Sequence, residues 1–333
     1  MTLLFRAPKA VSARALTRAP LADPDRLPSL DDIDWPWPGR NRRYGDIEVH
    51  VRETPGPAGA TPAIYLHGLG GTATNWNDLA GLLAHRAEGL AIDLPGFGLS
   101  PPPGIADYRM ATQATAIATI LDERGGEPVH LLGNSMGGGI ALLLAAARPD
   151  LVRTLTLISP AMPDLRPDLR RVSDPRMALA VVPLLGRRAK RALAETTARG
   201  QVERMLRLCF AEPELVPDLR IEQAAAELVE QLATPWAGRA VNTAAGAIFR
   251  DWLAPARRSL WSVARRVSAP TLVVWGAGDR VISVRKAPRL ARVLPSGRLL
   301  VVPRTGHTAQ MERPVTVARA VLALWDAAEA GTW

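Results

Sequence analysis

The chain has 333 residues and is 47% hydrophobic, enough for one large α/β domain with an inserted subdomain or for two small domains. Its single cysteine, Cys209, excludes an internal disulfide and a cysteine-based metal cluster, and its five scattered histidines offer no metal-ligand spacing, so we expect no metal. The formal net charge of +9 comes mainly from arginines that are not interleaved with aromatic residues as a base-stacking surface requires, so we expect no nucleic-acid partner.

Residues 1–40 are expected to form an irregular basic extension that is rich in arginine and proline. Their apolar start, residues 1–5, is too short for a signal peptide, and no later apolar run is long enough to span a bilayer. We therefore expect a cytoplasmic protein without stable membrane insertion. Trp35 and Trp37 predict that the extension is a strap that packs on the main domain.

Strands and helices alternate from residue 43 onward. A turn at Gly45 and Asp46 joins the two strands of a hairpin, and short apolar runs then predict buried strands separated by amphipathic helices. The expected strands are residues 47–51, 62–66, 89–93 and 128–133, and the expected helices are residues 76–86 and 107–122.

The stretch of residues 128–142 places one polar side chain at a sharp turn. An apolar strand stops at Gly133 and a helical pattern starts within a few residues, so Ser135 stands between them. Such an elbow strains the backbone of its corner residue and needs small neighbours, which Gly133 and Gly137 supply. We interpret Ser135 as a nucleophile.

The alternation is interrupted once and then resumes. A strand at residues 151–159 is followed by a helical pattern over residues 161–265, and strands return at residues 271–275 and 298–302. This order predicts a mostly parallel sheet with a helical lid near the carboxyl ends of the strands, where ligands bind. The expected domains are the extension at residues 1–40, a core at residues 41–160 and 266–333, and the lid at residues 161–265.

A serine nucleophile needs a base and a carboxylate, each just beyond a later strand, in the chain order serine, acid, histidine. Asp279 follows the first strand after the lid and His307 follows the second, and no other histidine lies after Ser135. We therefore predict that Ser135, Asp279 and His307 are the catalytic residues. Asp164 is the fallback acid, and Asp251 is a weaker candidate.

Two backbone N–H groups are expected to form an oxyanion hole. Met136 lies at a helix N-terminus directly after the nucleophile, and Leu69 lies in the loop after an early central strand. His67 is expected to order this loop rather than to transfer protons. The apolar content of the lid predicts a largely apolar acyl or aromatic pocket. Candidate pocket residues are Gly68, Asn134, Trp236, Phe249 and Trp252.

Five motifs together resemble the α/β-hydrolase fold superfamily, and the resemblance covers residues 40–330. The motifs are residues 67–68, 93–100, 133–138, 275–279 and 306–307. The resemblance implies an eight-stranded sheet with a helical cap after the sixth strand, no cofactor, and acyl-serine chemistry. It further implies that His307 deprotonates Ser135 and later a water, that Asp279 orients His307, and that Leu69 and Met136 hold the oxyanion.

Serine at position 135 argues against haloalkane dehalogenases and epoxide hydrolases, which form an ester on an aspartate. Residues 134–138 and 306–312 are similar to the carbon–carbon bond hydrolases that cleave ring-fission products of aromatic degradation. Thr308 and Ala224, however, stand where those enzymes carry a tryptophan and a substrate-binding arginine. Hydrolysis of a carboxylic ester is therefore the first choice, and carbon–carbon bond hydrolysis of the meta-cleavage-product type is the alternative.

Two further hypotheses stay open. A cofactor-free perhydrolase or acyltransferase would use the same three residues, and a receptor for a small apolar ligand would keep the fold without the chemistry. An inactive receptor has no need for a serine, an acid and a histidine at strand ends, which favours an enzyme. The expected partner is a small-molecule ester or related acyl substrate, and a homodimer stays open.

Overall fold

The computed structural model describes residues 18–102, 107–164 and 197–333. Eight strands form one sheet in the order β1-β2-β4-β3-β5-β6-β7-β8, in which β1 and β2 pair antiparallel, β2 pairs antiparallel with β4, and all other pairs are parallel. The strands are β1 Gly39–Tyr44, β2 Ile47–Thr54, β3 Ala63–Leu66, β4 Gly89–Ile92, β5 Val129–Asn134, β6 Val152–Ile158, β7 Thr271–Gly276 and β8 Gly297–Val302. The predicted eight-stranded, mostly parallel α/β-hydrolase sheet is confirmed.

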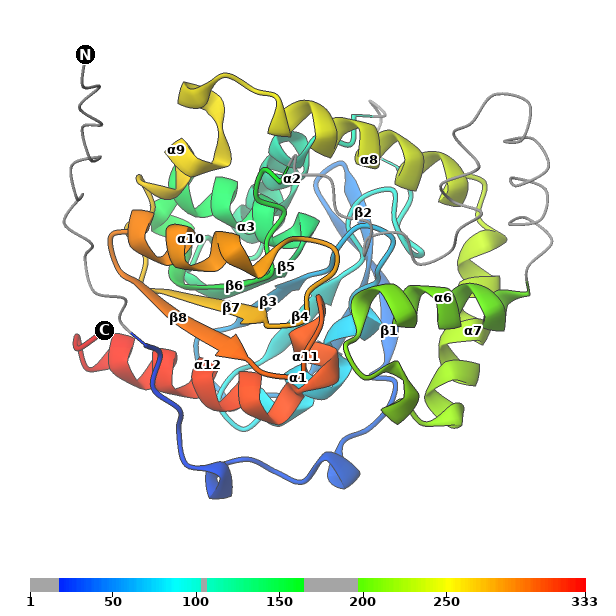
Figure 1. Cartoon of the computed structure of the whole chain (residues 1–333), viewed down its shortest axis with the longest axis horizontal. Coiled ribbons are helices and arrows are strands. Elements are labelled where there is room, and N and C mark those ends of the chain that lie inside the picture. The colour runs from blue at the N-terminus through cyan, green and yellow to red at the C-terminus, as the bar shows by residue number, and fades with distance from the viewer. Residues whose placement is uncertain (1–17, 103–106, 165–196) are drawn as a thin grey trace, which may run out of the picture.

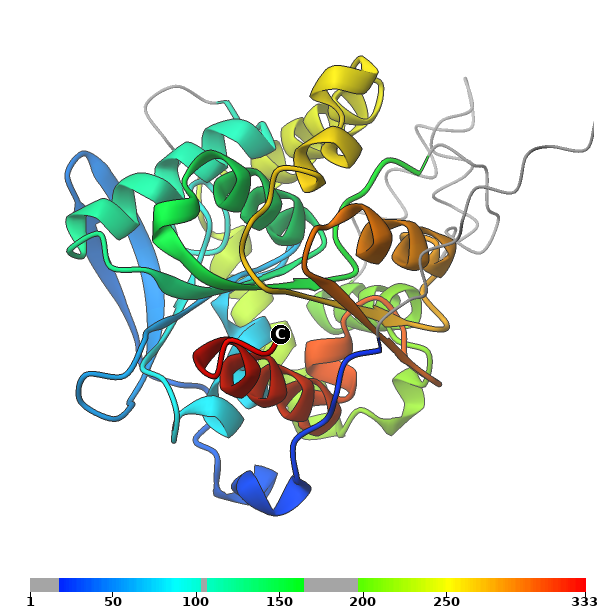
Figure 2. The same ribbon diagram turned by 90° about the vertical axis from the view of Figure 1, so that its left-hand side faces the viewer.

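Helices cover both faces of this sheet (Figure 1). One face carries α2 Met110–Glu123, α3 Met136–Ala147, α9 Leu260–Ala264 and α10 Ala287–Val293, and the other carries α1 Asn77–Leu83, α11 Ala309–Glu312 and α12 Pro314–Glu329. Figure 2 shows the two helical layers on either side of the twisted sheet. Because both faces are covered, the central strands β3 and β4 are apolar throughout rather than alternating.

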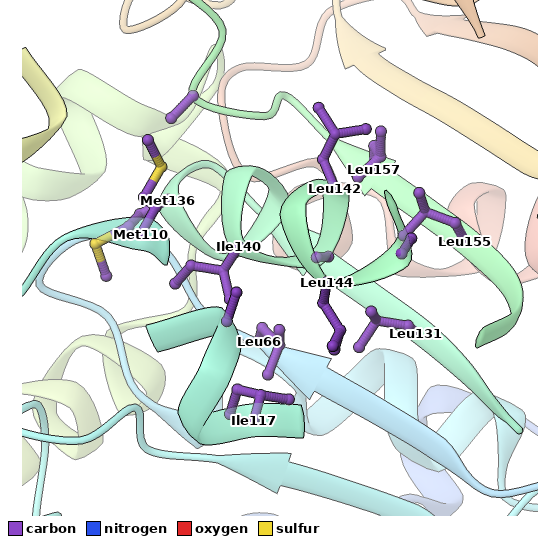
Figure 3. Close-up of a cluster of buried hydrophobic side chains, with 14 of the residues drawn as sticks. Leu66, Met110, Ile117, Leu131, Met136, Ile140, Leu142, Leu144, Leu155 and Leu157 are labelled. Atoms are coloured by element: carbon purple, nitrogen blue, oxygen red, sulfur yellow. The ribbon is translucent and has the colours of Figure 1, made fainter. Parts of the chain in front are cut away.

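The side chains of β3 alternate between two separate apolar clusters, as the period of a strand requires. Ile64 and Leu66 belong to the cluster under α2 and α3, whereas Ala63 and Tyr65 belong to the cluster under α1 and α12. Figure 3 shows the first cluster, in which the α3 side chains Ile140, Leu142 and Leu144 pack against Leu66 and three β5 and β6 leucines. This packing fixes the start of α3 relative to the ends of the strands.

Three further helices, α6 Ala198–Cys209, α7 Asp218–Leu232 and α8 Ala237–Trp252, lie over the carboxyl ends of the strands (Figure 1). The indole N–H of Trp252 donates to the carbonyl of Ala161 at 2.9 Å, which ties α8 to the loop after β6. The division into core and lid at residues 160 and 265 stays a prediction. The short helix α9, just inside that boundary, packs against α3 of the core.

The segment before β1 lies along the outside of the core. Ala19 and Ala22 donate backbone hydrogen bonds to the carbonyls of Leu299 and Arg319, and the indole of Trp37 donates to the carbonyl of Asn77 at 3.1 Å. In its described part, the extension is therefore a strap that packs a tryptophan on the domain. No helix of the described ranges is both long enough and apolar enough to cross a bilayer.

Candidate active site

Ser135 occupies the corner between β5 and α3, with backbone angles φ 52° and ψ −115°. A non-glycine residue at positive φ is strained, and the flanking glycines make this turn sterically feasible. A Cβ on Gly133 would lie 2.4 Å from the carbonyl oxygen of Gly137, and a Cβ on Gly137 would lie 2.2 Å from that of Leu66. Gly133 and Gly137 therefore leave the room that the turn at Ser135 needs, as the sequence predicts.

Asp279 and His307 lie side by side at the ends of the neighbouring strands β7 and β8. The Nδ1 atom of His307 lies 2.9 Å from Oδ2 of Asp279, and both residues are buried. The other carboxylate oxygen accepts the backbone N–H groups of Val281 and Ile282 at 2.8 and 2.9 Å. The carboxylate therefore has a fixed orientation, and the bond to Nδ1 leaves Nε2 of the imidazole as the basic nitrogen.

Asn134 joins the loop of His307 to the elbow of Ser135. Its side-chain amide donates to the carbonyl oxygens of His307 and Ile158, both at 3.1 Å. Since both amide hydrogens are used inside the protein, this side chain positions the histidine loop. Asn134 was predicted as a pocket residue, and a direct contact with substrate stays a prediction.

The loop after β3 is held by His67. One ring nitrogen, Nδ1, lies 2.7 Å from the carbonyl oxygen of Gly68, and the other, Nε2, accepts the N–H of Leu94 at 2.9 Å. Burial lowers the pKa of His67 to about 4, so this imidazole stays neutral and its Nδ1 carries the proton. His67 orders the loop that carries Leu69, in agreement with the expectation from sequence.

The expected oxyanion donors are the backbone N–H groups of Leu69 and Met136. Met136 is the first residue of α3, where N–H groups have no partner within the helix. Leu69 follows Gly68 in a turn closed by a hydrogen bond from Gly71 to Gly68 at 3.0 Å. A Cβ on Gly68 would lie 3.1 Å from the Cβ of Ser135, so this loop runs directly beside the serine.

Other acidic and thiol groups nearby have structural partners. Asp164, the fallback acid, is buried and lies 3.2 Å from the Lys286 ammonium, and it accepts the N–H of Ser283 at 3.0 Å. Asp93 accepts two backbone N–H groups, and burial raises its pKa to about 7. Burial also raises the pKa of the Cys209 thiol to about 12, so this thiol is not a competing nucleophile at neutral pH.

Sequence reasoning gave no role to Glu312, which the structure places behind His307. Its carboxylate accepts the N–H of Gly306 at 2.5 Å and those of Ala211 and Glu212 at 2.9 and 3.0 Å. The backbone N–H of His307 in turn donates to the carbonyl of Cys209 at 2.5 Å. The end of α6 is thus built into the wall of the histidine loop. An acidic residue five positions after the histidine was the only sequence signal of this contact.

A second carboxylate connects α7 to the loop after β3. Glu227 accepts the hydroxyls of Thr72 and Thr74, each at 2.8 Å. Between α6, α7 and the core lies a cavity of about 620 Å³ whose lining includes Gly70 and Gln310. These residues follow Leu69 and His307 closely in the chain, so the cavity flanks the candidate site.

The aromatic residues predicted for the pocket lie elsewhere on the lid. Trp236, Phe249 and Trp252 do not line this cavity, and Phe249 exposes 54% of its surface. Trp252 binds the loop after β6 through its indole N–H. Contact of these three side chains with a substrate stays a prediction.

A strained serine, a carboxylate-bound histidine and two N–H groups at the ends of parallel strands are the arrangement that the motifs predict. A family model described as the alpha/beta hydrolase fold matches residues 61–314. The chain belongs to the α/β hydrolase family. Its relatives include hydrolases, and this chain is an enzyme of that family.

Three similar proteins illustrate the range of the family. A 2-hydroxy-6-oxononadienedioate/2-hydroxy-6-oxononatrienedioate hydrolase from Cupriavidus pinatubonensis is 28% identical over 292 residues, which cover 84% of this chain and 91% of the relative. A monoacylglycerol lipase abhd6-B from Xenopus laevis is 26% identical, over 81% of this chain and 77% of the relative. A bacterial membrane phospholipase A of known crystal structure is 26% identical in sequence and superimposes with a TM-score of 0.67. The match covers 90% of this chain and 88% of the phospholipase chain.

Proposed function

We propose that this α/β hydrolase cleaves a carboxylic ester of a small, largely apolar substrate through an acyl intermediate on Ser135. The contact between His307 and Asp279 carries this proposal, together with the strained backbone of Ser135. A serine hydroxyl becomes nucleophilic when a base accepts its proton, and a carboxylate on the far nitrogen stabilises the protonated base.

In this mechanism Nε2 of His307 removes the proton of Ser135 while the serine oxygen attacks the ester carbonyl. The N–H groups of Leu69 and Met136 stabilise the negative charge on the carbonyl oxygen. Collapse of the tetrahedral intermediate breaks the bond to the alcohol, which takes the proton from His307. A water, deprotonated by the same nitrogen, then hydrolyses the acyl-serine and returns the enzyme to its first state.

The charges around the cavity favour a substrate without net charge. Its described lining holds five carboxylates and three arginines, together with apolar side chains of α6 and α7. Two of the arginines are already neutralised, because Arg220 pairs with Asp78 at 3.4 Å and Arg313 pairs with Glu212. Arg204 is the one arginine of this lining without an ion pair to a described residue.

Carbon–carbon bond hydrolysis is the second candidate, favoured by the similarity to the Cupriavidus enzyme over most of both chains. The name of that relative describes a substrate with two carboxylate groups. A dianion requires unpaired cations in its pocket, and the described lining of this cavity has more carboxylates than arginines. This balance places the ester first. A perhydrolase or acyltransferase would use the same residues and differ in the nucleophile that accepts the acyl group.

The test compares p-nitrophenyl esters of increasing chain length with a dienone dicarboxylate ring-fission product. Ester turnover is expected to exceed turnover of the ring-fission product, and Ser135→Ala is expected to abolish it without changing the circular dichroism spectrum. Ser159→Ala is the matched control, since Ser159 also ends a strand at positive φ, 43°, and is fully buried. Unchanged ester turnover in Ser135→Ala, or a higher kcat/KM for the ring-fission product, contradicts the proposal.

A further inference from the structure

One stretch of the sequence has a large excess of basic over acidic residues. Residues 252–311 hold 11 of the 41 basic residues but only one of the 32 acidic residues, Asp279, which is buried beside His307. The other 273 residues are almost balanced, with 30 basic and 31 acidic residues.

This stretch folds into neighbouring elements at the β8 edge of the sheet. The turn Ala256–Arg258, called η7, packs against α9, and α9 packs against α10, which covers β7 and β8 (Figures 1 and 2). Exposed arginines lie on η7, directly after α9, just before α10 and on α10, and we call their surface the basic edge. It consists of Arg257, Arg258, Arg265, Arg266, Arg285, Arg289 and Arg292.

The arginines of the basic edge have no counter-ions among the described residues. Arg289 lies over the ring of Trp261 at 4.0 Å, and the other six have neither an ion pair nor a side-chain hydrogen bond there. Several arginines elsewhere are paired: Arg148 binds two aspartates, and Arg199 binds three carboxylates. Unpaired like charges on one edge raise the electrostatic energy of the free protein and create a positive field for an anionic partner.

Exposed apolar side chains lie next to the basic edge. Phe249 and Leu253, four residues apart at the end of α8, expose 54% and 59% of their surfaces. The other side of α8 faces inward, where Ala244 and Ala247 are buried and Trp252 binds the loop after β6. Leu253 is followed after two residues by η7, so the apolar pair adjoins Arg257 and its neighbours.

We propose that the basic edge, with Phe249 and Leu253, binds the surface of an anionic lipid bilayer. A bilayer surface offers dense negative charge together with apolar depth, and amphipathic surfaces rich in arginine bind it through both. Single-stranded nucleic acid is bound by aromatic rings that stack on its bases, whereas Trp261, the aromatic residue among these arginines, is already covered by Arg289. The exposed Phe249 and Leu253 beside the arginines favour a bilayer over duplex DNA, whose surface has no apolar depth. Binding at this edge would bring the lid to the membrane.

The experiment measures co-sedimentation of the full chain with vesicles of phosphatidylcholine alone or with about one third phosphatidylglycerol. Binding is expected only to the anionic vesicles and is expected to disappear at 1 M salt, where the Debye length is about 3 Å. Arg265→Gln with Arg266→Gln is expected to weaken binding about 25-fold, since each basic residue near an anionic surface contributes about 1 kcal/mol. Phe249→Ser with Leu253→Ser is also expected to weaken it.

A matched control removes the same charge at the opposite edge of the sheet. Arg42→Gln with Arg43→Gln changes two exposed arginines of β1 and is expected to leave vesicle binding unchanged. Hydrolysis of a soluble short-chain ester by every variant reports on folding and on the active site, independently of the membrane. If an edge variant loses this activity, Arg257→Gln with Arg258→Gln replaces it.

Four results would overturn the inference. They are no binding to anionic vesicles, equal binding to both kinds of vesicle, an equal loss of binding in the β1 control, and tighter binding of duplex DNA than of vesicles at the same salt concentration.

Discussion

Replacement of Glu312 by glutamine changes one atom of a buried group that joins the lid to the histidine loop. The carboxylate accepts three backbone N–H groups, two from Ala211 and Glu212 on one oxygen and one from Gly306 on the other. Glutamine has the same shape, but its NH2 group cannot accept a hydrogen bond. In Glu312→Gln, at least one N–H group therefore faces another donor.

The size of the effect follows from which contact is lost. A hydrogen bond to a charged group contributes about 1.5–3 kcal/mol, and the orientation that keeps the two bonds to Ala211 and Glu212 loses only the bond to Gly306. We therefore expect the free energy of unfolding to fall by about 1.5–3 kcal/mol. Gly306 directly precedes His307, so the imidazole moves relative to Ser135. A small misplacement of a catalytic group lowers the rate by up to about 100-fold, and we expect kcat to fall about 10- to 100-fold with little change in KM.

Urea denaturation and steady-state kinetics on a short-chain ester measure both quantities. Glu214→Gln is the control, because Glu214 is exposed and has no ion pair or hydrogen bond through its side chain to a described residue. A Glu312→Gln enzyme with the kcat of the parent would refute the view that this carboxylate positions His307. A large loss of stability with unchanged kcat would assign Glu312 a purely structural role.

Three further variants test the rest of the site. Asp279→Asn is expected to lower kcat about 10⁴-fold by favouring the wrong tautomer of its histidine partner, and a loss below tenfold would contradict that role. Gly68→Ala is expected to lower kcat because its Cβ would lie 3.1 Å from that of Ser135, whereas Gly238→Ala on α8 meets nothing within 4 Å and is expected to raise the unfolding free energy by about 1 kcal/mol. The raised pKa of Asp93, about 7, predicts that its ionisation destabilises the fold. Stability is expected to fall as pH rises from about 4 to 7 by at most about 1.4 kcal/mol per unit, a slope that urea titrations should find absent in Asp93→Asn.

The ends of the strands were the most predictable part of the molecule. The parallel strands contain short apolar runs, and the carboxyl ends of two of them are marked by glycine with a polar residue close by, at Gly133 before Ser135 and Gly276 before Asp279. Because carboxyl ends of parallel strands meet at one edge of a sheet, residues far apart in the chain were expected together. The 2.9 Å contact between Asp279 and His307 agrees with that expectation.

Contacts between the lid and the core were not predictable from the sequence. Glu312 lies about 100 residues from its lid partners, and Glu227 lies about 155 from Thr72. No local pattern specifies such pairs, because they depend on how α6 and α7 dock on the core. The same limit applies to lid aromatics. Helical spacing places Phe249 and Trp252 on a helix but does not show which side of the helix faces the protein. In the structure Phe249 is exposed, whereas Trp252 points inward.

Covalent labelling determines whether Ser135 is the nucleophile of this enzyme. The full chain is treated with a fluorophosphonate ester, and intact mass followed by peptide mapping locates the adduct. We expect a single adduct on Ser135, no adduct in Ser135→Ala, and much slower labelling in His307→Gln, since the base that activates the serine is then missing. Labelling at another residue, or labelling of Ser135→Ala at the rate of the parent, would contradict it.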